Sequence, residues 1–221
     1  GEPNGIKTLV KFRGRSVEHG PHGIVLGPDG LLYIVVGNLT APVQAYDRKS
    51  PYRSYYEGLL AQPKYEDPGG HAIGVEAPGG SIIRTDIRGS SVEIVAGGIR
   101  NAYDLTFNRD GELFTHDSDM ETDEGTPWQR PTRLLHVTPG AEFGWRSGWS
   151  KWPDYFVDSL PAVADTGRGS PTGMVFYDHV MFPLRYHDVI FSCDWARGRI
   201  MAFRLKRSGT TYTTSSEVFL E

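Results

Sequence analysis

Apolar residues along this chain of 221 residues fall in short alternating runs, and glycine or proline interrupts nearly every stretch that could form a helix. Two segments, Glu18–Tyr33 and Ile99–Phe114, share one order: a polar lead-in, an apolar run, an Asp-Gly turn and a second apolar run. An Asp-Gly pair between two apolar runs favours a β-hairpin. The pattern therefore predicts a repeated, all-β architecture.

The same alternation predicts short strands along the whole chain. We expect them at residues 7–13, 24–26, 32–36, 81–86, 92–96, 104–108, 113–116, 133–138, 161–164, 174–177, 189–192, 199–205 and 211–219. Grouped in fours, they form about three sheets, at residues 22–99 with an insertion at 40–80, 102–169 and 171–220, after an outer strand at 7–13.

This grouping favours three blades of a β-propeller over a β-sandwich, which is the main alternative. Propellers close with roughly four to eight blades. We therefore expect the chain to be part of a larger ring, or to have its open sides covered by a partner chain, because exposed strand edges invite association.

Composition narrows the range of partners. The net charge is −4 and Lys and Arg are scattered, which argues against nucleic acid. No apolar run approaches the roughly 20 residues of a membrane span, and residues 1–4 lack the features of a signal peptide. Cys193 is the single cysteine, so neither an intrachain disulfide nor a cysteine-based zinc site is expected.

The predicted topology sorts the loops between the two ends of each sheet. One end takes tight turns, and the other takes the loops that lead into the first strand of each sheet, where His19 and Arg100 occupy equivalent positions. An imidazole beside the carboxylate of Glu18 suits general-base chemistry. The alternative is a histidine that only bonds to a neighbouring loop carbonyl.

Arg100 and Asn101 follow two glycines, Gly97 and Gly98, which would let the backbone turn sharply toward the axis of the ring. A guanidinium offers a planar fork of donors to a carboxylate or a developing oxyanion. The pair is therefore a candidate anion contact, and the alternative is a salt bridge between blades.

Carboxylates alternate in the loop at 117–123, where Asp117, Asp119 and Glu121 are candidate Ca²⁺ ligands because calcium prefers clustered oxygen donors. An EF-hand is not supported, since Thr122 stands where that loop requires glycine. A solvated acidic loop is an equal alternative.

Three further features belong to the loops of the same end. Asp194 and Trp195 would line a central cavity or cap the third blade. We interpret the insertion at 40–80 as a lid or contact loop. Asn38 begins a glycosylation sequon, which we interpret as accidental.

These residues resemble the soluble glucose/sorbosone dehydrogenases that depend on pyrroloquinoline quinone (PQQ), and more closely the membrane-bound dehydrogenase domains of Planctomycetes and Verrucomicrobia. The motifs are Glu18-His-Gly-Pro-His-Gly-Ile-Val-Leu-Gly-Pro-Asp-Gly30, Gly98-Ile-Arg-Asn101, Leu113-Phe-Thr-His-Asp-Ser-Asp-Met-Glu121, Gly125-Thr-Pro-Trp-Gln-Arg-Pro-Thr132, Phe143-Gly-Trp145 and Gly169-Ser-Pro-Thr-Gly173. They follow the family order over nearly the whole chain.

The resemblance implies a six-bladed propeller that oxidises a sugar or alcohol with PQQ, in the periplasm or otherwise outside the cytoplasm, with a cytochrome c as electron acceptor. It implies His19 as the general base, with Glu18 where the family has aspartate. Arg100, Asn101 and Asn38 would contact the quinone, and the loop of Asp117 would hold Ca²⁺. No Cys-x-x-Cys-His occurs, so covalent haem is not expected in this segment.

The sequence is also compatible with two other functions. The propeller could serve as a non-catalytic binding or assembly module within a larger complex outside the cytoplasm. A weaker alternative is a Ca²⁺-dependent hydrolase of the lactonase type, because a fold alone does not fix a function.

Overall fold

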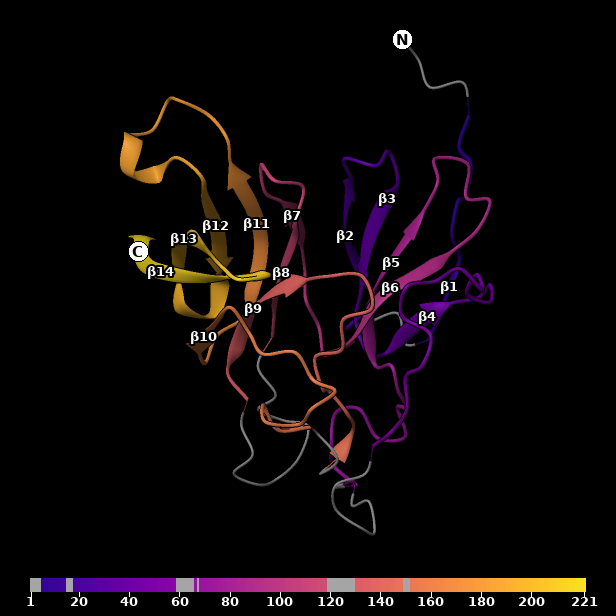
Figure 1. Ribbon diagram of the computed structural model, residues 1–221. Helices are drawn as coiled ribbons and strands as arrows, with labels where there is room; N and C mark the ends of the chain where they lie inside the picture. Colours follow the sequence, from indigo (N-terminus) through magenta and orange to yellow (C-terminus); the bar gives the residue numbers. More distant parts are fainter. Residues whose placement is uncertain (1–4, 15–17, 59–65, 67, 119–129, 149–151) are drawn as a thin grey trace.

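The computed structural model describes residues 5–14, 18–58, 66, 68–118, 130–148 and 152–221. Within them, three four-stranded antiparallel sheets follow one another in chain order (Figure 1). The first contains β2 (Pro21–Leu26), β3 (Leu32–Val36), β5 (Gly80–Thr85) and β6 (Glu93–Ile99). The second contains β7 (Leu105–Phe107), β8 (Leu113–Asp117), β9 (Thr132–Val137) and β10 (Ala164–Gly167). The third contains β11 (Pro171–Tyr177), β12 (Val189–Asp194), β13 (Arg199–Ser208) and β14 (Thr211–Leu220).

In each sheet the strands pair in the order in which they occur along the chain, each with the next. This is the arrangement of propeller blades. Two short 3₁₀ segments, Leu184–Tyr186 and Trp195–Arg197, lie in the third sheet's loops. The expected fold class, all-β with about three blades of a partial propeller, is confirmed.

The middle sheet buries apolar side chains on both of its faces, and this burial holds the first and third sheets against it. On β9, Leu134 belongs to the core cluster shared with the third sheet, and its neighbour Leu135 belongs to the cluster shared with the first. Successive residues of a strand point to opposite faces. Both leucines are fully buried, and such burial stabilises the fold by about 1.5–3 kcal/mol per side chain.

The repeated Asp-Gly turns lie at one end of the first two sheets. Gly30 and Gly111 adopt left-handed φ angles of 79° and 81°, which glycine tolerates without steric cost. Gly30 N–H donates to the carbonyl of Gly27 at 2.9 Å, and Gly111 N–H donates to that of Asn108 at 3.0 Å. The two segments matched by sequence therefore form equivalent turns.

Two strand predictions need correction. The strand expected at residues 7–13 is confined to β1 (Phe12–Gly14), which pairs with β4 (Thr40–Pro42) inside the insertion. The partner strand is short and ends at Pro42, whose nitrogen cannot donate a ladder hydrogen bond. The weak strand expected at 161–164 lies at Ala164–Gly167 instead, where residues of β10 pair with β9.

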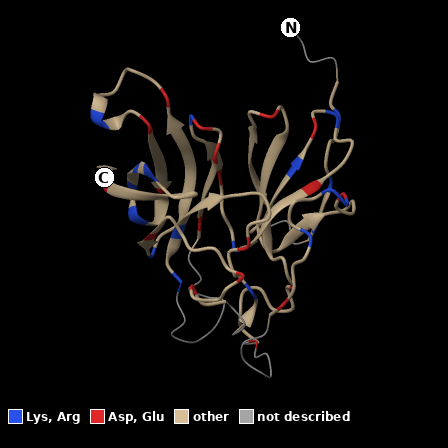
Figure 2. Ribbon diagram, in the orientation of Figure 1, with Lys and Arg blue, Asp and Glu red and all other residues tan. Residues whose placement is uncertain are grey.

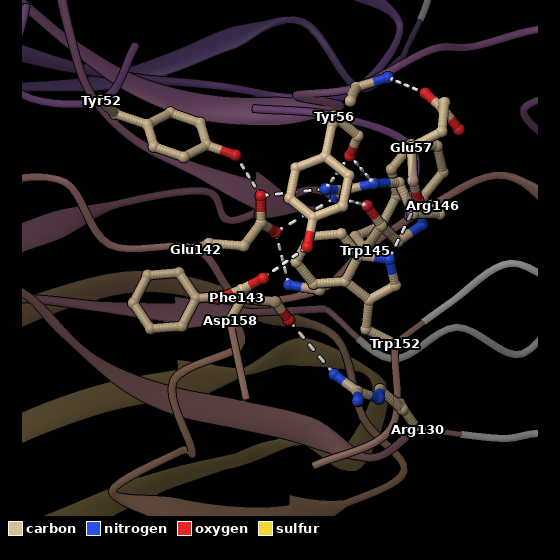
Figure 3. A network of polar contacts seen from close by, with 12 residues as sticks. Tyr52, Tyr56, Glu57, Arg130, Glu142, Phe143, Trp145, Arg146, Trp152 and Asp158 are labelled. Atoms are coloured by element: carbon tan, nitrogen blue, oxygen red, sulfur yellow. Dashed lines mark hydrogen bonds and ion pairs between the residues drawn. The ribbon is translucent and has the colours of Figure 1, made fainter. Parts of the chain in front are cut away.

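A buried ion pair ties the insertion to the loop after β9 (Figure 3). Arg146 is fully buried and donates to both carboxylate oxygens of Glu142 at 3.1 Å. Its guanidinium also donates to the carbonyl of Tyr56 at 2.6 and 3.0 Å, and the Tyr52 hydroxyl donates to the Glu142 carboxylate. A buried ion pair needs such additional hydrogen bonds to offset its desolvation. The network therefore fixes this part of the insertion against the loop after β9.

Charged residues are interspersed over all three sheets rather than gathered by sign on one of them (Figure 2). A surface of that kind offers no continuous basic track for a phosphate backbone. None of the helical segments in the described part of the chain has the length and apolar character that crossing a bilayer requires.

Candidate functional site

His19 and Arg100 meet between the first and second sheets. His19 lies in the loop before β2 and Arg100 in the loop before β7, and each is 6% exposed. Arg100 Nη1 lies 3.4 Å from His19 Nε2 and 3.2 Å from Ser118 Oγ. Two side chains that the repeat pattern placed at equivalent loop positions therefore converge.

The hydrogen bonds of His19 define its tautomer. Nδ1 lies 2.5 Å from Asn38 Oδ1, an amide oxygen that can only accept, so Nδ1 carries the proton. Arg100 can only donate, which leaves Nε2 as the acceptor. Both contacts select the neutral imidazole whose lone pair lies on Nε2.

The end of β3 supports this geometry. Asn38 N–H donates to the carbonyl of Arg100 at 2.9 Å, and Thr40 Oγ1 donates to that of His19 at 3.3 Å. A Cβ atom at Gly37 would lie 2.4 Å from the His19 carbonyl oxygen. Glycine is required there because the two loops approach so closely. His19 itself has a φ of 48°, a left-handed conformation uncommon for non-glycine residues.

Asp117 holds the backbone of the second loop. Its fully buried carboxylate accepts the N–H groups of Arg100 at 3.0 Å, Asn101 at 2.9 Å and Ser118 at 3.0 Å, and lies 3.5 Å from the Arg133 guanidinium. Burial raises the pKa of Asp117, while Arg133 and the backbone donors oppose that shift. These are the contacts of a structural carboxylate, and calcium ligation by Asp117 stays a prediction.

Asp194 plays the same part in the third sheet. It ends β12 as Asp117 ends β8, and it accepts the N–H of Ser170, in the loop before β11, at 2.8 Å. Arg199 pairs with its carboxylate at 3.2 Å. The Trp195 side chain is 71% exposed and bonds Ser170 Oγ through its indole N–H at 2.6 Å. Both residues therefore organise the loop of their own sheet.

Glu18 does not hydrogen-bond to His19 directly. Its Oε1 accepts a hydrogen bond from His71 Nε2 at 2.9 Å, and the His71 ring packs on the His19 ring with centroids 4.5 Å apart. Sequence reasoning missed His71, because it lies inside the insertion with no motif or spacing that relates it to His19. Its position directly after Gly69 and Gly70 was the only signal available.

Asn101 faces a second histidine. Its Oδ1 lies 2.9 Å from His22 Nε2, and the His22 ring stacks on Tyr103 with centroids 4.7 Å apart. Next to this group a cavity of about 490 Å³ runs along β1 and the start of β2, with Arg13, Glu18 and His22 among its lining residues. The cavity is of the size that small-molecule sites usually have.

The donors present at the site suit an anionic quinone such as PQQ. Asn38 Nδ2 is buried without a hydrogen-bond partner, and a buried donor left unpaired costs about 1–3 kcal/mol unless a ligand accepts from it. The Arg100 guanidinium lies at the other edge of the His19 ring, 3.4 Å from Nε2. These two residues are therefore the ones that could hold a carboxylate or quinone oxygen.

The predicted calcium site is described only in part. Among the residues that the structure places, no group of three or more His, Cys, Asp or Glu side chains lies close enough to hold a metal ion. Asp119 and Glu121 lie outside the described residues.

Comparison with solved structures supports the fold. The PQQ-bound aldose sugar dehydrogenase from Streptomyces coelicolor is 19% identical, with a TM-score of 0.56 over 94% of this chain and 52% of that chain. The soluble aldose sugar dehydrogenase from Escherichia coli, in its apo form, is 16% identical, with a TM-score of 0.55 over 93% and 57%. A glucose dehydrogenase is 18% identical, with a TM-score of 0.59 over 92% and 54%.

No protein-family model matches the chain, and no curated protein matches it. The chain spans about half the length of the solved structures to which it is similar. Its sheets, paired in sequence order, are therefore those of a partial β-propeller of the type found in aldose sugar and glucose dehydrogenases.

Proposed function

We propose that this chain is the part of a quinone-dependent sugar or alcohol dehydrogenase that carries the catalytic base and one cationic contact to the cofactor. The contact between His19 and Arg100 carries the proposal, because it joins a proton acceptor and a guanidinium from two blades. The similarity in fold to a PQQ-bound aldose sugar dehydrogenase supports the choice of cofactor and substrate class.

His19 Nε2 would take the proton of the substrate hydroxyl as its C–H bond gives up a hydride. PQQ, when bound, supplies the acceptor for that hydride. The long 3.4 Å contact from Arg100 to Nε2 leaves room for the guanidinium to turn toward an anionic oxygen of the cofactor. Asn38 would keep the ring oriented through Oδ1 and offer its Nδ2–H to the same ligand.

The remaining candidate residues complete the proposal. Asn101, Asp194 and Trp195 would add contacts to the cofactor from the loops of the second and third sheets, and the loop that begins at Asp117 would hold Ca²⁺ through Asp119 and Glu121. A cytochrome c outside the cytoplasm would accept the electrons, and further blades would close the ring.

The first test is reconstitution of the intact protein with PQQ and Ca²⁺. We expect saturable quinone binding and aldose-dependent dye reduction. Arg100→Gln should weaken quinone binding by about 10-fold or more, because a charge-assisted hydrogen bond contributes roughly 1.5–3 kcal/mol. Arg109→Gln is the matched control, since that guanidinium is exposed and pairs with Asp178 and Asp188 at the turn end of the sheets.

The other functions predict different results. Quinone binding and dye reduction that are both absent would remove the dehydrogenase. Hydrolysis of a lactone with Ca²⁺ and without quinone would support the hydrolase instead.

A further inference from the structure

His71 lies against the candidate base, although it belongs to the insertion rather than to a blade. Its ring is tilted by 56° against the ring of His19, with centroids 4.5 Å apart. Its side chain is 20% exposed. Ala72, the next residue along the chain, is buried in one apolar cluster with Trp145, so His71 comes from an anchored segment.

The contacts of His71 also define its protonation. Nε2 donates to Glu18 Oε1 at 2.9 Å, since a carboxylate accepts. Nδ1 is buried and has no hydrogen-bond partner. A proton on Nδ1 would be a buried donor without an acceptor, which costs about 1–3 kcal/mol. The geometry therefore places a proton of His71 on Nε2.

The imidazole of His19 is consequently held on both edges and on one face. Asn38 bonds Nδ1, Arg100 faces Nε2, and His71 covers the ring. Glu18 is the carboxylate among these neighbours, with its side chain 56% exposed, and it reaches the base through His71 rather than directly. These contacts restrict tilting and turning of the His19 ring, so the same nitrogen faces each substrate molecule that binds.

We propose that His71, anchored by Glu18, is a positioning residue for the base. It keeps the His19 ring in the Nδ1–H tautomer, with Nε2 directed at the substrate. This inference rests on the proposed function for its effect on turnover, whereas its effect on the tautomer of His19 is independent of any activity.

Turnover gives the first readout. His71→Ala should lower kcat by about 10-fold, in the lower part of the range seen when partners that orient a functional histidine are removed, with KM changed less than about 2-fold. His71→Phe should restore most of the lost kcat, because it keeps a ring against His19. His179→Ala is the matched control, since His179 is an exposed histidine in the loop between β11 and β12. A Phe variant no better than the Ala variant would contradict positioning by the ring.

A double-mutant cycle gives the second readout. Glu18→Ala should lower kcat in the same direction as His71→Ala but by less. The variant with both changes should be no worse than His71→Ala alone, because Glu18 acts through His71. Losses that multiply would show that Glu18 acts on His19 directly, and would overturn the proposal.

The third readout needs no turnover. Long-range ¹H–¹⁵N NMR of the histidine rings should show the Nδ1–H tautomer of His19 in the native protein and a mixture of tautomers in His71→Ala. An unchanged His19 spectrum in a folded His71→Ala variant would overturn the proposal. If the native protein neither binds quinone nor oxidises sugars, the proposed function fails while this NMR comparison still decides the role of His71.

Discussion

His19 and His116 are both buried histidines with contacts at both ring nitrogens, yet the sheets place them in different surroundings. His116 lies on β8, 3% exposed, with Nδ1 2.9 Å from Ser192 Oγ and Nε2 2.9 Å from Thr166 Oγ1. His19 lies in a loop, bonded to an amide on one side and facing a guanidinium at 3.4 Å on the other.

The difference separates a structural histidine from a candidate base. Hydroxyl groups can donate and accept, so Ser192 and Thr166 satisfy both nitrogens of His116 within a closed interface between sheets. Burial lowers the pKa of His116 to about 4, which keeps it neutral. At His19 the Nε2 lone pair faces the Arg100 guanidinium at 3.4 Å, a long contact that a substrate hydroxyl can replace. Burial alone therefore does not distinguish the two histidines, whereas the partners of their ring nitrogens do.

The largest expected effect comes from removing the base. His19→Leu should lower kcat by about 100- to 10,000-fold, the usual contribution of general-base catalysis. His116→Leu should leave kcat per folded molecule unchanged, while the orphaned Ser192 hydroxyl lowers the free energy of unfolding by about 1–3 kcal/mol; Thr166 Oγ1 keeps its bond to the Thr132 carbonyl at 3.1 Å. Steady-state kinetics on protein corrected for its folded fraction checks both. A His19→Leu variant with full kcat would show that His19 is not the base.

The second effect is a change in the free energy of unfolding with pH, caused by His116. The pKa of His116 is about 4 in the folded protein and about 6.5 in the unfolded chain, so the unfolded state binds the proton more readily between these values. The stabilisation is complete above pH ~6.5 and is lost as pH falls toward ~4, by roughly 3 kcal/mol in all. Urea unfolding at a series of pH values should show this loss in the native protein. The His116→Leu variant should lack that part of the pH dependence, and equal slopes would contradict the assignment.

Much of the fold could be predicted from local patterns. Asp29-Gly30 and Asp110-Gly111 are turn signals with a physical basis, and they align His19 with Arg100 in the sequence. The strand at β1 was harder to predict. Its pairing with Thr40–Pro42 joins two distant segments, and no periodicity within either segment contains that information.

The site could be predicted only as far as the repeat extends. His19 and Arg100 follow from equivalent loop positions, whereas the partners of each depend on tertiary contacts. Glu18 precedes His19 in sequence, so a direct interaction was the natural expectation, but the chain reversal at His19 directs the carboxylate to His71 instead. The insertion that carries His71 follows no repeat, so its register against the base could not be derived from the sequence.

The smallest expected effect concerns the edge of the ring that Asn38 holds. Asn38→Asp places a carboxylate against His19 Nδ1 without changing the size of the side chain. A negative charge at that distance stabilises the protonated imidazole, so the acidic limb of the kcat/KM profile should move to higher pH by about one unit. The pH profile of sugar oxidation measures this shift directly.

Asn108→Asp provides the matched control for that shift. Its side chain accepts the N–H groups of Asp110 and Glu112 at the turn between β7 and β8, at the other end of the sheet from His19. The same change of amide to carboxylate there should leave the pH profile in place. Profiles that move equally in both variants would mean that net charge, rather than the contact at Nδ1, sets the behaviour of the base. A shift confined to Asn38→Asp would show that the β3 end tunes His19 through one hydrogen bond, in contrast to the two hydroxyls that hold His116.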